Sequence, residues 1–393
     1  MKGNKIFRCL CLCVILSSIL SSLVLASSAN ADILEDSLRE QLDELGLNEL
    51  TRYVELVEPE YRDYLPGLDW RDIIAQGGHY PDLTQLFRLF IHTLFNEIVL
   101  NSYLLRQLLV ISILSAFFHQ IQVQKEEKSL VDLAFSVCFL ILIFVGLQSF
   151  RTVVSIANSS LQDMVSFMYA LLPLMSTLLA AVGGVTSAAI FHPVLVAVVG
   201  GIAGLARSLL FPIIYISAIL GLLAHFSPIL PLSRLAGLAK QVSVMLLTLF
   251  FTLFFGVLAV RGAIAPVADG IALRTAKFLT SSLIPVVGGM FSNAVEVVVG
   301  GSLLIKNTVG VFGLLLIFFM VALPIIKIWA IILIYKLVGA LIQPICDQRL
   351  VDALASLESS LTMIFVSLAM VALMFFLSIV TLVGFGNLAA VMR

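Results

Sequence analysis

Residues 309–342 read VGVFGLLLIFFMVALPIIKIWAIILIYKLVGALI, an apolar stretch of 34 residues with only two charged side chains, Lys327 and Lys336. As a helix this stretch measures about 51 Å at ~1.5 Å per residue, whereas the hydrocarbon core of a bilayer is about 30 Å thick. Pro324 lies near its middle. The stretch therefore predicts either a broken membrane helix or two tightly joined spans.

The rest of the chain has the same character. Of its 393 residues 60% are hydrophobic and 12% are charged, and the mean hydropathy is +1.10. Soluble domains carry about 25% charged residues, so most of this chain cannot present an ordinary water-facing surface. We predict an all-α, polytopic helical membrane protein with broken or re-entrant segments and a small helical N-terminal ectodomain. The net charge is −1, and no basic stripe indicates nucleic-acid binding.

The N-terminus predicts a signal peptide over residues 1–31. A basic start precedes an apolar run at 9–25 and then Ala29 and Ala31, the small residues that signal peptidase accepts. An uncleaved anchor helix is the alternative, but the run is short for a span of about 20 residues. Residues 32–95 hold fourteen Asp or Glu against five Arg. Their leucine spacing predicts an acidic, extracytoplasmic helical segment.

Residues 96–393 form the expected multi-span transmembrane domain, with about seven to nine membrane segments. The signal peptide places residue 32 outside, so the first span delivers Lys125 and Lys128 to the cytosol, as the positive-inside rule expects. The apolar runs that predict spans are 98–121, 130–150, 164–182, 194–226, 242–260, 309–342 and 361–385.

Residues 262–310 form an irregular region in which short apolar stretches alternate with Pro, Gly-Gly pairs and single charges. Stretches this short predict re-entrant, interfacial or buried helices, and non-helical backbone at membrane depth needs protein or water around it. If this part is helical, Arg274 and Lys277 share a face, with Asp269 farther round. Together with Lys306 they are candidates for lining a conduit. Amphipathic helices on the outer surface are the alternative.

Three further residues within or beside apolar runs are candidates for conduit lining or packing. Charged groups at membrane depth are costly and mark functional sites, and here they include Arg207 and Lys327, the latter beside Pro324. Arg and Lys can instead reach the interface with their long side chains. His192 is either a ligand site or part of a turn at a helix boundary.

Motifs for catalysis or cofactor binding are missing from the sequence. It contains no G-x-x-x-x-G-K-[ST] loop for nucleotide phosphates, no H-E-x-x-H and no haem or iron–sulfur spacing. Cys138 and Cys346 are the cysteines that follow the signal peptide, and no CxxC pair indicates a zinc site. We therefore expect neither enzymatic activity nor a cofactor.

Four long strings, in this order along the chain, resemble the stage III sporulation protein AE family of endospore-forming bacteria. They are VGGVTSAAIFHP at 182–193, VADGIALRTAKF at 267–278, PVVGGMFSNA at 285–294 and LIKNTVG at 304–310. The resemblance implies a polytopic protein made in the mother cell and placed in the membrane that engulfs the forespore. It brings no catalytic residues to this sequence.

The resemblance further implies a multi-protein assembly. Its partners are other stage III subunits, a forespore-side membrane partner and the lipid bilayer. The assembly joins mother cell and forespore across the intermembrane space and acts as a channel or feeding tube, which forespore development after engulfment requires. A self-sufficient secondary transporter is the alternative, because broken helices and intramembrane charges also occur in transporters. Flux by the purified protein alone in liposomes would favour the transporter.

The signal-peptide interpretation predicts that the mature chain begins at Asp32, after the small residues Ala29 and Ala31. N-terminal sequencing of the protein extracted from membranes measures this directly. Recovery of Met1 or Lys2 would instead identify an uncleaved anchor with its N-terminus in the cytosol.

Overall fold

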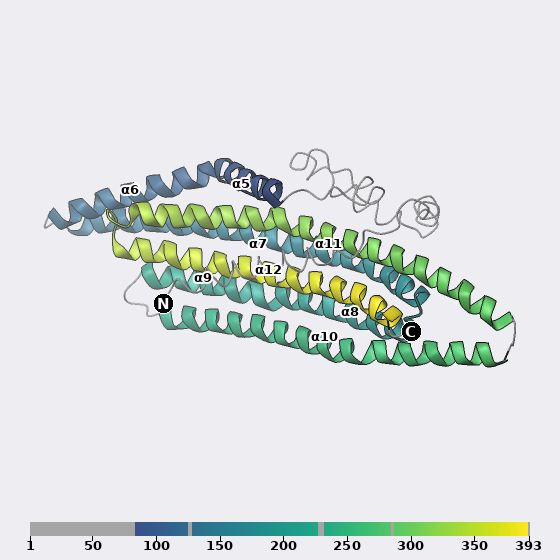
Figure 1. Ribbon diagram of the computed structural model, residues 1–393. Helices are drawn as coiled ribbons and strands as arrows, with labels where there is room; N and C mark the ends of the chain where they lie inside the picture. Colours follow the sequence, from purple (N-terminus) through teal and green to yellow (C-terminus); the bar gives the residue numbers. More distant parts are fainter. Residues whose placement is uncertain (1–82, 125–127, 227–231, 284–286, 392–393) are drawn as a thin grey trace.

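A computed structural model of the chain describes residues 83–124, 128–226, 232–283 and 287–391 (Figure 1). The predicted signal peptide and residues 32–82 of the predicted acidic segment lie outside the described residues. The elements are α5 (Leu83–Leu100), α6 (Ser102–Gln124), α7 (Lys128–Ala181), α8 (Val185–Leu205), the π-helical segment η1 (Ala206–Leu210), α9 (Phe211–Phe226), α10 (Ser233–Leu283), α11 (Val287–Ile342) and α12 (Gln348–Val391).

The chain is a polytopic helical membrane protein, and no strand occurs in the part that the structure describes. This is the expected solution for apolar segments, because a helix satisfies its own backbone hydrogen bonds where no water can do so. Among the residues that the structure describes, five helices are long and apolar enough to cross a membrane: Leu133–Ala181, Val185–Phe226, Ser233–Ala259, Val299–Ile342 and Gln348–Gly384. A sixth candidate span comes from α5 and α6 together, which are bent by 52° around Asn101.

Within the described residues, these candidate spans are fewer and longer than the apolar runs from which the sequence predicts seven to nine membrane segments. Helix α7 runs unbroken through both predicted spans 130–150 and 164–182. The intervening residues include neither Gly nor Pro, so nothing in them ends a helix. Helix α11 likewise continues through Pro324. Membrane helices tolerate such a proline because neighbouring groups satisfy the backbone carbonyl that it leaves unpaired.

The region 262–310 is also more regular than predicted. Helix α10 continues to Leu283 and α11 begins at Val287, so the expected interruptions within these helices are absent. The two helices form a hairpin that extends past the ends of α7, α8 and α12 (Figure 1). Alternating apolar and polar residues in this region therefore mark a long helical pair and not a series of short segments.

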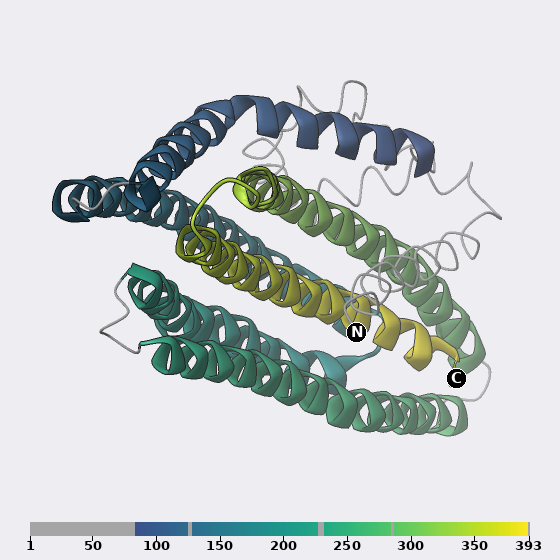
Figure 2. The same cartoon turned by 90° about the vertical axis from the view of Figure 1, so that its left-hand side faces the viewer.

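Helix α12 lies at the centre of the bundle. It packs against α11 on one side and against α9 and α10 on the other, and it also contacts α7 (Figure 2). The contact with α7 is close: a Cβ atom added at Gly146 would lie 2.4 Å from Cδ1 of Leu357. Gly313 of α11 is similarly close to α7, with Leu171 Cδ2 at 2.8 Å from such a Cβ. Small residues therefore let these three helices approach one another.

Two tight turns fix the directions of the helices. At the end of α7, Gly183 has φ 97°, and the amide of Gly184 donates to the carbonyl of Leu179 at 2.9 Å. This is the Schellman arrangement, in which glycine adopts the left-handed conformation, and it turns the chain into α8. Between α11 and α12, the Asp347 carboxylate accepts a hydrogen bond from the amide of Arg349 at 2.7 Å. Asp347 thus caps the N-terminus of α12.

The close approach of α11 and α12 predicts the effect of a single methyl group. A Cβ at Gly310 would lie 2.1 Å from Cγ2 of Val383, so Gly310→Ala should destabilise the protein by about 1–3 kcal/mol through overpacking. Thermal unfolding in detergent measures this loss. The matched control is Gly339→Ala on the same helix, where no atom lies within 4 Å of the added Cβ. Because alanine has a higher helix propensity than glycine, this variant should stabilise the protein by up to about 1 kcal/mol. Equal unfolding temperatures for the two variants would contradict this packing.

Candidate functional site

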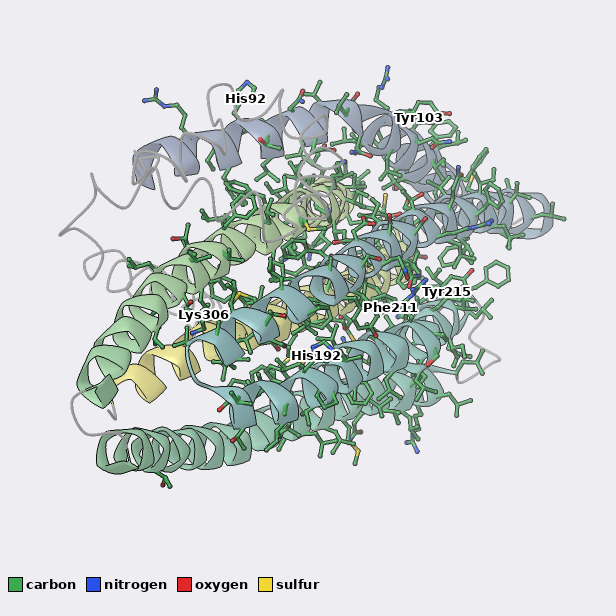
Figure 3. The ribbon with its side chains drawn as sticks, turned by 90° about the vertical axis from the view of Figure 1, so that its right-hand side faces the viewer. His92, Tyr103, His192, Phe211, Tyr215 and Lys306 are labelled. Atoms are coloured by element: carbon green, nitrogen blue, oxygen red, sulfur yellow. The ribbon has the colours of Figure 1, made fainter. Side chains whose placement is uncertain are left out.

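Lys306 is the most deeply buried charged residue of the described core. Its side chain is 0% exposed, and its Nζ donates a hydrogen bond to the backbone carbonyl of Val383 at 2.6 Å (Figure 3). Residue 306 belongs to α11 and residue 383 to α12, so this bond crosses the interface between them. Beside it, Oδ1 of Asn307 is buried without a hydrogen-bond partner among the described residues. Burying an ammonium group with one carbonyl partner costs free energy, so this lysine is a candidate functional residue and not only a packing residue.

His192 lies within α8, at its interface with α7 (Figure 3). The interpretation of this residue as part of a turn at a helix boundary is wrong, because α8 begins at Val185 and continues through Pro193. Nδ1 of His192 is 3.2 Å from Oγ of Ser176. The single hydrogen of the Ser176 hydroxyl is donated to the carbonyl of Leu172 at 2.7 Å. Oγ of Ser176 can therefore only accept from His192, so Nδ1 of His192 is the protonated ring nitrogen and the donor.

Arg207 lies in the π-helical segment η1, between α8 and α9. Its Nη1 donates a hydrogen bond to Oε1 of Gln162 on α7, and both side chains are exposed on the single chain. The structure has one π turn at this point, inside the predicted run 194–226, and the helix continues into α9. Single π turns inside α-helices often occur at functional sites, where they redirect a side chain.

Lys327 lies on the part of α11 that packs against α5. Its charge acts on the carboxylate of Glu97, which is only 6% exposed. Leu94 of α5 packs against Ile326 and Ala330 of α11 in the same contact. Sequence reasoning missed Glu97, although Leu94, Glu97 and Ile98 recur at helical spacing and predict a shared buried face.

The three candidates Asp269, Arg274 and Lys277 all lie on α10. Their side chains lie outside the described residues, so their convergence on one polar patch remains a prediction. The helix itself places Arg274 and Lys277 three residues apart, which puts them on neighbouring positions of one face.

The four described candidates do not meet in a single site. Lys306 joins α11 to α12, His192 joins α8 to α7, Arg207 joins η1 to α7, and Lys327 joins α11 to α5. What they share is a polar interaction across a helix interface. Such interactions hold membrane helices together and fix their register.

A second polar band, which the sequence did not reveal, crosses the bundle near the turn between α11 and α12. Lys336 of α11 forms an ion pair with Glu358 of α12 at 3.4 Å, and Nζ of Lys240 on α10 donates to Oγ of Ser359. In the turn itself, Sγ of Cys346 donates to the carbonyl of Ser112 at 3.2 Å. Burial, with the carboxylate of Asp347, raises the pKa of the Cys346 thiol, which therefore stays protonated at neutral pH.

A family model described as stage III sporulation protein AE matches residues 69–386, which is most of the chain. The chain belongs to the stage III sporulation protein AE family. The stage III sporulation protein AE of Bacillus subtilis (strain 168) is 38% identical over 300 residues, which cover 76% of this chain and 75% of that protein. No solved structure matches the chain. Membership of this family confirms the resemblance predicted from the four strings and supports a role in sporulation.

The burial of Lys306 predicts that its charge serves function more than stability. In Lys306→Met the side chain keeps its length and loses its charge, so the cost of burying an ammonium disappears and the unfolding temperature should stay equal or rise. Spore formation should nevertheless fail, because intramembrane charges are retained for function. Thermal unfolding and spore counts measure the two effects.

The control for Lys306→Met is Lys336→Met, on the same helix, whose side chain is 56% exposed. This variant should alter both readouts little, because exposed ion pairs contribute about 0–1 kcal/mol. A lowered unfolding temperature for Lys306→Met would show instead that the lysine mainly holds α11 to α12.

Proposed function

We propose that this chain is a membrane subunit of a channel, or feeding-tube, complex that links mother cell and forespore. In this role it supports forespore development after engulfment. The observation that carries the proposal is the family match over residues 69–386, which falls on a polytopic helical membrane protein. The proposed role is structural and conduit-forming, and it does not involve catalysis.

The proposed location is the mother-cell membrane around the forespore, reached through the signal peptide. The proposed partners are the other stage III subunits and a membrane protein on the forespore side. Polar bridges such as Lys306 to Val383 support a subunit with a defined register between its helices. The same buried lysine is the observation that favours the alternative, a self-sufficient transporter, because transporters place charged groups near the bilayer centre.

The proposal predicts the phenotype of a strain that lacks this chain. Such a strain should complete engulfment and then fail in late forespore gene expression, and the wild-type chain supplied in the mother cell alone should restore spores. An affinity tag on the restored chain should recover other stage III proteins from detergent-solubilised membranes. Reporter expression, spore counts and mass spectrometry measure these three outcomes.

Two results would contradict the proposal. If spores were restored only when the chain is expressed in the forespore, the protein would act in the forespore and not in the mother cell. Solute accumulation by the purified chain alone in liposomes, with no stage III proteins recovered with the tag, would identify a self-sufficient transporter.

A further inference from the structure

Helix α7 carries a continuous polar face in its middle third. The residues recur three or four positions apart, so they lie along one side of the helix. The opposite side of the same turns is buried, with Val153, Ala157, Leu161 and Met164 each 0% exposed. The exposed residues that make up the α7 polar face are Gln148, Arg151, Thr152, Ser155, Ser159, Gln162 and Asp163.

The depth of the α7 polar face follows from two close contacts with neighbouring helices. At one end of the face, Gly146 of α7 contacts Leu357 of α12. At the other end, Leu171 of α7 contacts Gly313 of α11, and Gly313 in turn lies near Ile379 of α12. The polar face therefore runs alongside the α12 residues between 357 and 379. Helix α12 has no charged residue after Glu358. This part of α12 is the apolar portion that crosses the membrane.

Helix α10 shows what a lipid-facing surface looks like at the same depth. Lys240 contacts Ser359, so the α10 residues that follow run beside the apolar part of α12. The large exposed side chains there are apolar, with Met245 71% and Leu253 58% exposed. The exposed Thr248 bonds its own helix, through the carbonyl of Val244 at 2.8 Å. At one depth, then, α10 presents an apolar surface and α7 presents a polar one.

The polar face extends beyond α7 onto η1. Arg207 donates to Gln162, so a second cation joins Arg151 on this surface, against the single carboxylate of Asp163. In Figure 3 α7 runs beside α8, which leads into η1 and α9. Lipid could not solvate two guanidinium groups, and charged residues at membrane depth face the bundle interior or water. An apolar protein surface would strip water from them just as lipid does.

We propose that the α7 polar face, together with Arg207, lines a water-filled pathway through the membrane. Small polar solutes are its ligand class, and the excess of one positive charge favours anions. The face is exposed on the single chain, so the other walls of the pathway come from outside it. This inference deepens the proposed function by naming the wall of the conduit, but it needs only that α7 crosses the membrane at this level.

Thiol accessibility tests the pathway in the full chain, in membranes from sporulating cells that contain its partners. The native cysteines are replaced, and single cysteines are introduced as Ser155→Cys and Ser159→Cys on the polar face. Two controls are matched in depth: Leu249→Cys on the outer face of α10, and Ser160→Cys, which is 3% exposed on the buried side of α7. The probe is a charged, membrane-impermeant methanethiosulfonate, which reacts with the thiolate that forms in water.

We expect the cysteines of the polar face to react at least about tenfold faster than either control, because only they meet water at this depth. Equally slow reaction at all positions would overturn the pathway and show that protein covers the face. Equally fast reaction at Ser159→Cys and Leu249→Cys would also overturn it, because this level would then lie outside the bilayer. Neither result depends on the sporulation phenotype of the deletion strain, so the two proposals fail separately.

Discussion

Between membrane helices, apolar burial gives little driving force, because lipid tails are as apolar as leucine. Helices α7, α11 and α12 therefore depend on close contact, which glycine permits at positions 146, 310 and 313. A cation at Lys306 bonds α11 to α12 just beyond this contact. The remaining helices attach to these three: α6 and α8 pack along α7, α9 and α10 pack on α12, and α5 packs on α11. Loss of the central contact would leave each of these attachments without its support.

The fold class followed from sequence because hydropathy and length alone determine which segments can cross a membrane. The positions of helix ends did not follow. The polar residues around Gln162 fell between the predicted spans 130–150 and 164–182, although they form one face of a helix whose other face, at Leu161 and Met164, is buried. Hydropathy averages over both faces, so it hides an amphipathic turn inside a long apolar helix. Pro324 was equally misleading, because local propensity yields to the packing of neighbouring helices.

Candidate residues were recognisable as a group but their partners were not. A charge in an apolar run drew attention to Lys327, since such charges are rare at membrane depth, whereas Lys306 was a candidate as part of the irregular region 262–310. The partner of Lys306 is the backbone carbonyl of Val383, 77 residues away, and any residue type can offer a carbonyl. The charge of Lys327 acts on Glu97, which lies just after the acidic segment 32–95 and was not considered as its partner. Pairing across distant helices is fixed by tertiary packing, which single-sequence patterns do not encode.

The unbroken course of α7 has a mechanical consequence. Its 54 residues form a rod about 81 Å long, well beyond the thickness of a bilayer. A tilt of about 5° around its midpoint would shift its two ends by about 7 Å relative to each other. One end of this rod leads to α6 and the other turns directly into α8 at Gly183. A displacement on one side of the membrane can thus reach the other side along one continuous helix, in which Pro173 is the point where bending is easiest.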